Sequence, residues 1–123
     1  MEYSPLVADH FVHPRNVGRF APGQDVVSGS AGSVAQGTRF ALSASIEGDR
    51  IRALRQQVYG CPHSIAAASW LSDRLVGAGL KDLQQWRWQE AADALQIPAE
   101  KRGRLLVLED ALRALESAWH THP

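Results

Sequence analysis

The chain has 123 residues, of which 45% are hydrophobic and 21% charged, a composition and length typical of one globular domain. Thirteen basic residues balance thirteen acidic ones, so no net charge attracts nucleic acid or anionic lipid. The opening residues lack a signal-peptide core, and no apolar run is long enough to span a bilayer. The single cysteine excludes an internal disulfide. We therefore expect a soluble, cytoplasmic protein.

A short helix is predicted at the start of the chain. Ser4 suits the N-cap and Pro5 the first turn, where a missing N–H costs nothing. Pro14 ends this helix, because the residue before a proline avoids helical geometry. Asparagine, glycine and proline residues between positions 16 and 23 then predict a loop.

Three antiparallel strands in a meander are predicted next. Residues 25–31 form a weak first strand, and apolar residues alternate from Phe40 to Ile46 in the second. The sequence Glu47-Gly48-Asp49 is a hairpin signal, so residues 51–59 are the returning strand. One face of the sheet should be buried.

The second half of the chain is predicted to be helical. Helices are expected over residues 62 to about 77, from residue 80, over 90–95 and over 100–120. In the last of these, leucines recur at helical spacing, so it should lie across the sheet. Strands followed by helices predict an α+β fold in one domain over residues 1–123.

The junction between the last strand and the first long helix contains the only cysteine, Cys61. Gly60 permits a sharp turn and Pro62 suits the first helical position. Cys61 should therefore face the free N–H groups of a helix start, which favour the thiolate. Two interpretations are open: a reactive or metal-binding thiol, and a buried cysteine that acts as a small hydrophobe.

Three segments together resemble the iron–sulfur cluster assembly scaffolds of the IscU type and the N-terminal domain of NifU-type proteins. Residues 3–20 read Y-S…D-H-F…H-P-R-N-V-G…F, similar to the family's D-H-Y-x-x-P-R-N-x-G start. Residues 59–69 read Y-G-C…S-I-A…S, similar to its Y-G-C-G-x-x-I-A-x-S-S segment. Residues 108–112 read L-E-D-A-L, where the family has A-E-D-A-I. The resemblance implies a three-stranded antiparallel sheet with helices packed on one face and a long C-terminal helix.

The family's cluster ligands are mostly absent. Its members hold a cluster or zinc with three cysteines, an aspartate and often a histidine. Aligned here, Gln36 stands at the first cysteine, Thr38 at the aspartate and Arg104 at the third cysteine, while only the second survives as Cys61. The family's L-P-P-V-K chaperone motif is reduced to Ile97-Pro98 and Lys101. A [2Fe–2S] cluster needs four soft ligands, so we do not expect a monomer to hold one in the family's way.

Cys61 is the expected cofactor-binding residue, and Cys61 with His63 the candidate metal ligands. Iron, a cluster, zinc and no metal all remain open. The first hypothesis is a divergent scaffold that binds iron or a cluster weakly, or between two copies in a homodimer, through Cys61. The second is a metal-free module that docks on a cysteine desulfurase or another cluster-assembly protein. The third is a lone reactive thiol that accepts a persulfide or senses redox state, and none of the three is an enzyme.

Other residues that carry chemistry have plainer interpretations. His63 is expected to be exposed on the first turn of its helix, and the pair His10 and His13 is expected to be structural rather than metal-binding. Most of the four tryptophans should be core residues, and the arginines from position 50 to 55 should lie on a solvated strand face.

Overall fold

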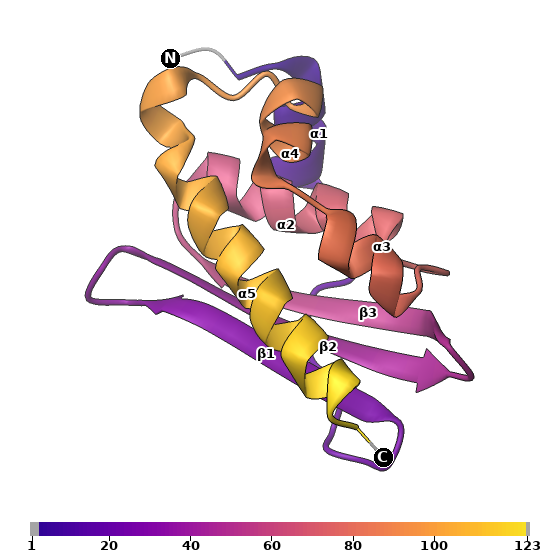
Figure 1. Ribbon diagram of the computed structural model, residues 1–123. Coiled ribbons are helices and arrows are strands. Elements are labelled where there is room, and N and C mark those ends of the chain that lie inside the picture. The colour runs from indigo at the N-terminus through magenta and orange to yellow at the C-terminus, as the bar shows by residue number, and fades with distance from the viewer. Residues whose placement is uncertain (1–2, 123) are drawn as a thin grey trace.

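The computed structural model describes residues 3–122 (Figure 1). Its elements, in chain order, are α1 (Pro5–Val12), β1 (Val26–Ser33), β2 (Thr38–Glu47), β3 (Arg50–Tyr59), α2 (Pro62–Arg74), α3 (Leu80–Gln85), α4 (Trp88–Ala94), the 3₁₀ turn η1 (Ala99–Lys101) and α5 (Gly103–His120). The predicted first helix is confirmed, and Ser4 caps it by accepting a hydrogen bond from the Val7 N–H at 3.2 Å.

The strands form the predicted three-stranded antiparallel meander in the order β1-β2-β3. The register pairs Ala31 with Phe40 and Phe40 with Val58. Phe40, Leu42 and Ala44 therefore share one face of β2, and all three are buried. The opposite face carries small polar side chains such as Ser43. The alternation seen in the sequence thus separates a core face from an open face.

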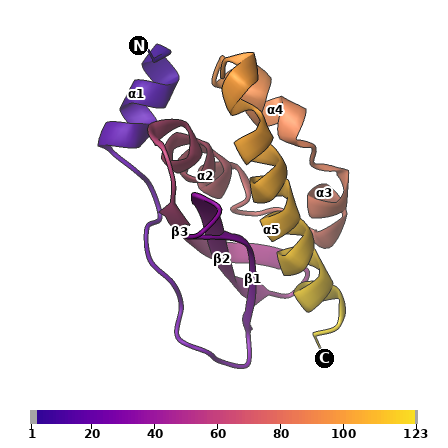
Figure 2. The same ribbon diagram turned by 90° about the vertical axis from the view of Figure 1, so that its left-hand side faces the viewer.

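The helices cover only the core face of the sheet (Figure 2). α5 contacts β1 and β2, while α2 contacts β3. Gly29 marks the closest approach of β1 to α5, because a Cβ there would lie 2.2 Å from the backbone nitrogen of Leu115. Only a glycine lets these two backbones pack at that distance. The α+β fold with helices on one face is confirmed.

The buried face of α5 follows the predicted leucine spacing, and Leu105, Leu108, Leu112 and Leu115 are at most 1% exposed. Trp70, Trp86 and Trp119 are also buried, as expected for most of the tryptophans, while Trp88 packs at the edge of the core. Within residues 3–122, no helix has both the length and the apolar composition to cross a membrane.

Two helix boundaries differ from the prediction. α2 ends at Arg74 rather than near residue 77, because residues 77–79 turn back along the outer edge of β3. The Gly77 N–H donates to the Ile51 carbonyl and the Ile51 N–H to the Ala78 carbonyl, both at 2.8 Å. These bonds replace helical ones. The predicted last helix is also divided, since η1 precedes an α5 that begins at Gly103.

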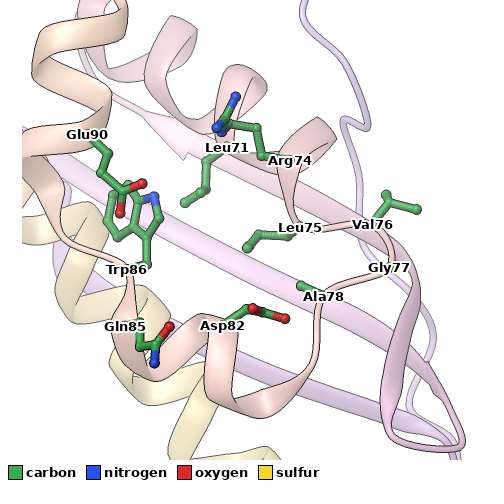
Figure 3. Close-up of a pocket in the computed structure, with 10 residues that line it drawn as sticks. All are labelled: Leu71, Arg74, Leu75, Val76, Gly77, Ala78, Asp82, Gln85, Trp86 and Glu90. Carbon is green, nitrogen blue, oxygen red and sulfur yellow. The ribbon is translucent and has the colours of Figure 1, made fainter.

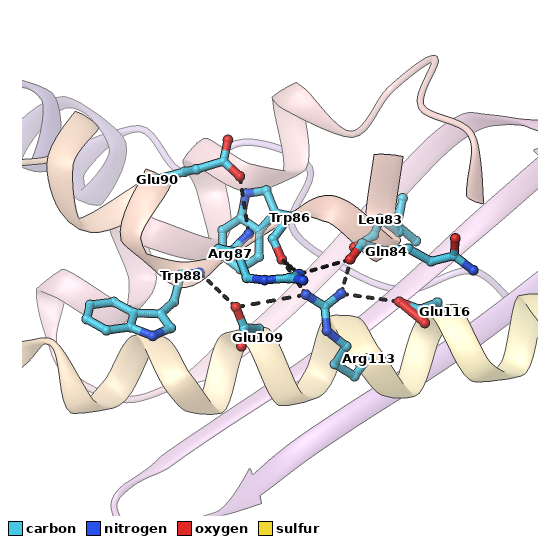
Figure 4. Close-up of polar contacts among 9 residues, drawn as sticks. All are labelled: Leu83, Gln84, Trp86, Arg87, Trp88, Glu90, Glu109, Arg113 and Glu116. Carbon is cyan, nitrogen blue, oxygen red and sulfur yellow. Dashed lines mark hydrogen bonds and ion pairs between the residues drawn. The ribbon is translucent and has the colours of Figure 1, made fainter. Parts of the chain in front are cut away.

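Arg113 of α5 ties the short helices to the long one (Figure 4). Its guanidinium donates to the Leu83 carbonyl at 2.6 Å and to the Trp86 carbonyl. Glu116 accepts from the same guanidinium at 3.2 Å. One side chain thus adds a charged donor to two carbonyls at the end of α3, which also accept from the Trp86 N–H and from the Arg87 guanidinium.

Candidate functional site

The end of β3 and the start of α2 place Cys61 at a helix N-cap, as predicted. The residue has an extended backbone, with φ −79° and ψ 171°, and Pro62 opens the helix. Gly60 fits the close packing here, because a Cβ at this position would lie 3.0 Å from the Ser64 Cβ and Ser64 would have to shift. The same point is 3.8 Å from the Gly37 carbonyl oxygen, so the turn between β1 and β2 reaches this junction.

The thiol of Cys61 is half-buried and surrounded by groups that stabilise its anion. Its Sγ lies 3.6 Å from the Ser64 Oγ. Burial alone raises the pKa of the thiol. This effect is outweighed by hydrogen bonds from the N–H and hydroxyl of Ser64 and from the His63 N–H, with a smaller effect from the charge of Arg104. The net pKa of the thiol therefore lies below its ordinary value. The site therefore favours a thiolate, the nucleophilic form of cysteine.

The expectation that His63 is exposed was wrong. Its side chain is only 3% exposed, and its ring lies edge-on to the ring of Tyr3 with centroids 4.9 Å apart. Burial lowers the pKa of His63, and the charges of Lys101 and Arg104 lower it further, while Glu100 opposes them. Tyr3 and the residues before α5 enclose this first helical turn, which sequence periodicity did not reveal. The imidazole is therefore neutral and held in the structure at neutral pH.

Three segments meet at this end of the molecule: the β1–β2 turn, the start of α2 and the start of α5 (Figure 1). They bring Cys61 close to Arg104, as the comparison with the scaffold family implied. Thr38 is buried at the base of the turn, whereas the Gln36 side chain is exposed and its N–H donates to the Ser33 Oγ at 3.1 Å. Gln36 therefore makes no contact with Cys61.

The groups gathered around Cys61 do not fit a cluster or a tightly held metal ion. Within residues 3–122, no group of three or more histidine, cysteine, aspartate or glutamate side chains is placed to hold a metal. The charge that acts on the thiol is that of the Arg104 guanidinium, which has only hydrogen-bond donors and repels cations. A single chain thus supplies one soft ligand where a [2Fe–2S] cluster needs four.

His10 and His13 do not form a metal pair. The Nδ1 of buried His10 lies 2.7 Å from the Ser69 Oγ, which joins α1 to α2, while His13 is exposed and follows the last residue of α1. Burial lowers the pKa of His10, with a smaller effect from Arg15 that Asp9 and Asp73 oppose. His10 therefore has the structural role that was expected.

A cavity of about 530 Å³ lies at the far end of α2, against α3 and α4 (Figure 3). α2 has 13 residues, so this cavity is about 20 Å from Cys61 along the helix. Its carboxylates already bind the starts of helices: Asp82 accepts from the Gly79 N–H at 2.8 Å and Glu90 from the Arg87 N–H at 3.2 Å. The cavity is separate from the thiol, and its acidic groups serve the local fold.

The sequence did not predict the roles of two residues at the site. Ser64 is fully buried and bonds to the thiol three residues away, a spacing that N-cap geometry would have suggested. Tyr3 was noted only as part of the family's opening motif, and nothing in the sequence placed it against His63 across 60 residues.

Comparison with known proteins supports one family. The model of the "NifU-like N terminal domain" family matches residues 2–121. The iron–sulfur cluster assembly scaffold protein IscU of Escherichia coli is 33% identical over 116 residues, which are 93% of this chain and 91% of that protein. The IscU scaffold of Azotobacter vinelandii is 32% identical over the same shares. A bifunctional NifU/MnmA protein of Rubrobacter xylanophilus is 33% identical over 121 residues, which are 95% of this chain but only 24% of that longer protein.

Solved structures support the fold. A protein from Fervidobacterium islandicum, described as a putative iron–sulfur cluster assembly scaffold for the SUF system, superposes with a TM-score of 0.69. The match covers 93% of this chain and 96% of the other at 15% identity. A NifU-like N-terminal protein from Brucella abortus superposes with a TM-score of 0.63 over 95% of this chain and 91% of the other, at 14% identity.

Proposed function

Because this chain belongs to the NifU-like N-terminal domain family, we propose that it takes part in iron–sulfur cluster assembly as a scaffold-like protein whose monomer does not hold a cluster. It acts as a metal-free module that docks on cluster-assembly partners, of which a cysteine desulfurase is the first candidate. Its role is non-catalytic. The observation that carries this proposal is the position of Arg104 beside Cys61, at the point where the family's pattern has a ligand.

The physical argument is one of charge and ligand number. A guanidinium stays protonated at any physiological pH and offers no lone pair to a metal. Beside a thiolate it stabilises the anion and opposes a cation at the same place. The fold is that of the family, so a partner that recognises the fold rather than the metal ligands can still dock, although the ligand set and the chaperone motif are reduced.

Docking is tested with purified partners. The chain is mixed with a cysteine desulfurase, and separately with an IscU-type scaffold that holds all its cysteines, and each mixture is analysed by size-exclusion chromatography with light scattering. Co-elution with either protein, kept in Cys61→Ala, supports a docking module. If the chain elutes alone from both mixtures, the module proposal fails.

A second candidate is iron, zinc or a cluster held weakly between two copies through Cys61. The half-exposed thiol favours this candidate, because a second chain can reach it. His63 is less suited to join as a ligand, since its buried ring must first leave Tyr3. Anaerobic incubation with iron and sulfide distinguishes the two candidates: this one requires a coloured dimer that Cys61→Ala abolishes.

A third candidate is the thiolate itself, as a persulfide acceptor or redox sensor. The lowered pKa of Cys61 and its contact with Ser64 favour this candidate. It is compatible with a metal-free docking module, because neither needs a filled metal site. Measurement of thiol reactivity, described below, tests it.

A further inference from the structure

The open face of the sheet carries a groove of about 680 Å³ that lies away from α5 and from Cys61. Residues 19–22 form its wall, and all three strands form its floor. The strand register places Ser28 beside Ser43 on one rung and Ser30 beside Ala41 and Gln57 on the next. The floor is therefore made of small side chains, which leave room above the sheet.

The first half of the groove's wall is anchored to the sheet. The Gly18 N–H donates to the Gln56 carbonyl at 3.0 Å, and the Phe20 N–H donates to the Ser43 Oγ at 3.1 Å. The Arg55 guanidinium lies over the Phe20 ring, 4.9 Å from its centroid. These contacts hold the segment in place before any ligand arrives, which lowers the entropic cost of binding.

Four of the residues that line the groove carry hydrogen-bond donors whose side chains have no partner among the described residues: Arg19, Arg39, Ser28 and Ser30. Arg19 and Arg39 are the charged residues that line it, and within residues 3–122 neither has a carboxylate within 4.0 Å. Some arginines outside the groove are paired, for example Arg15 with Asp9 at 2.8 Å, and others are not. The hydroxyls of Ser28 and Ser30 also have no hydrogen-bond partner in the described part of the chain.

We propose that this groove binds a small organic molecule through a phosphate or carboxylate group. Guanidinium forks bind such oxyanions with two parallel hydrogen bonds, and serine hydroxyls add further donors. The lining contains no carboxylate that would repel an anion. Its volume lies within the range of small-molecule sites. The site is on the opposite face from the core helices, so it is independent of the state of the thiol and of the function proposed above.

The test uses isothermal titration calorimetry at low ionic strength on the full chain, with pyrophosphate and citrate as probes. We expect at least one probe to bind. Arg19→Gln and Arg39→Gln should each weaken its binding about tenfold, because each removes a charge-assisted pair of bonds. Arg74→Gln is the matched control: Arg74 is an exposed arginine on the last turn of α2 that lies over the Trp70 ring, outside the groove. It should leave the affinity unchanged.

A second variant keeps the test decisive if an arginine variant unfolds. Ser30→Asp places a carboxylate on the exposed floor and should abolish binding, while circular dichroism shows a folded chain. Preference for pyrophosphate or citrate tells which oxyanion the groove selects. The proposal is overturned if neither probe binds the wild-type chain, or if Arg74→Gln weakens binding as much as Arg19→Gln and Arg39→Gln do.

Discussion

The Arg104 guanidinium lies beside the Cys61 thiol, close enough for its charge to lower the pKa of that thiol. The two residues come from the starts of different helices, α5 and α2, 43 positions apart in the chain. The alignment by motif places both residues at ligand cysteines of the scaffold family. On that alignment a permanent cation stands in place of one ligand, and such a charge stabilises an anion rather than a metal ion.

Reactivity of the thiol follows from this pair. We expect Cys61 to react with iodoacetamide at neutral pH faster than a free cysteine, since more of it is thiolate. Arg104→Gln should raise the pKa of the thiol and slow alkylation at pH 7, by a small but measurable factor, because Arg104 is the weakest of the groups that lower this pKa. Lys81→Gln, an exposed cation on α3, is the control and should not change the rate. An equal rate in Arg104→Gln and wild type would show that the guanidinium does not act on the sulfur.

Stability should fall on mild acidification, in part because of His63. Its pKa in the fold lies below the ordinary value of 6.5, so below that pH the unfolded chain binds more protons than the folded chain. The contribution is fully present above pH 6.5 and decreases as the pH falls toward the folded pKa. We expect the melting temperature to drop from about pH 7.5 to about pH 5.5, and to drop less in His63→Gln.

The control for the pH experiment is His120→Gln, because His120 is exposed at the end of α5. The melting temperature of this variant should change with pH as steeply as that of the wild type. Buried His10 has a lowered pKa as well, so His63→Gln is expected to reduce the slope without removing it. A slope in His63→Gln as steep as in the wild type contradicts a buried neutral imidazole.

Gly29→Ala should be among the most destabilising single substitutions. The added Cβ would lie 2.2 Å from the Leu115 nitrogen, so α5 must move away from β1. We expect a loss of about 3 kcal/mol in the free energy of unfolding, measured with urea. Gly103→Ala is the matched control, because a Cβ there meets no atom within 4 Å, and it should leave stability nearly unchanged. Similar midpoints for both variants would contradict the close packing of β1 on α5.

Arg113→Met should loosen the short helices from α5. It removes two charge-assisted hydrogen bonds, one to the Leu83 carbonyl and one to the Trp86 carbonyl, which then keep only the Trp86 N–H and the Arg87 guanidinium as donors. We expect a cost of about 2 kcal/mol by urea unfolding. Glu116→Gln removes only the partly exposed ion pair at 3.2 Å and should cost less than about 1 kcal/mol. Equal losses of stability in Arg113→Met and Glu116→Gln would assign the effect to the ion pair rather than to the bonds with the carbonyls.

Local signals in the sequence were enough for most of the fold. Period-two alternation from Phe40 to Ile46 and the Glu47-Gly48-Asp49 turn predicted β2, β3 and their pairing, and leucine spacing predicted α5. The predictions that were wrong concerned features that depend on contacts between residues distant in the sequence. The end of α2 moved because residues 77–79 bond to the edge of β3, and His63 is buried because Tyr3 closes over it. Neither contact leaves a periodic pattern.

The candidate site was predicted to the same degree. Cys61 at a helix start, and the approach of Arg104 to it, followed from local turn chemistry and from alignment to the family. The role of Ser64 and the groove on the open face of the sheet could not be predicted in this way. The groove residues come from a loop and three strands, and their charges become notable only once the structure shows that Arg19 and Arg39 have no acidic neighbours.

The central claim, that one chain cannot hold a cluster, is tested most directly by anaerobic reconstitution with iron and sulfide. The readouts are visible absorbance, bound iron per chain and molecular mass by size-exclusion chromatography with light scattering. A matched variant, Gln36→Cys with Arg104→Cys, restores the three-cysteine pattern around Cys61 and should become coloured. The wild-type monomer should remain colourless and free of iron. A coloured wild-type monomer with stoichiometric iron, lost in Cys61→Ala, would contradict the claim.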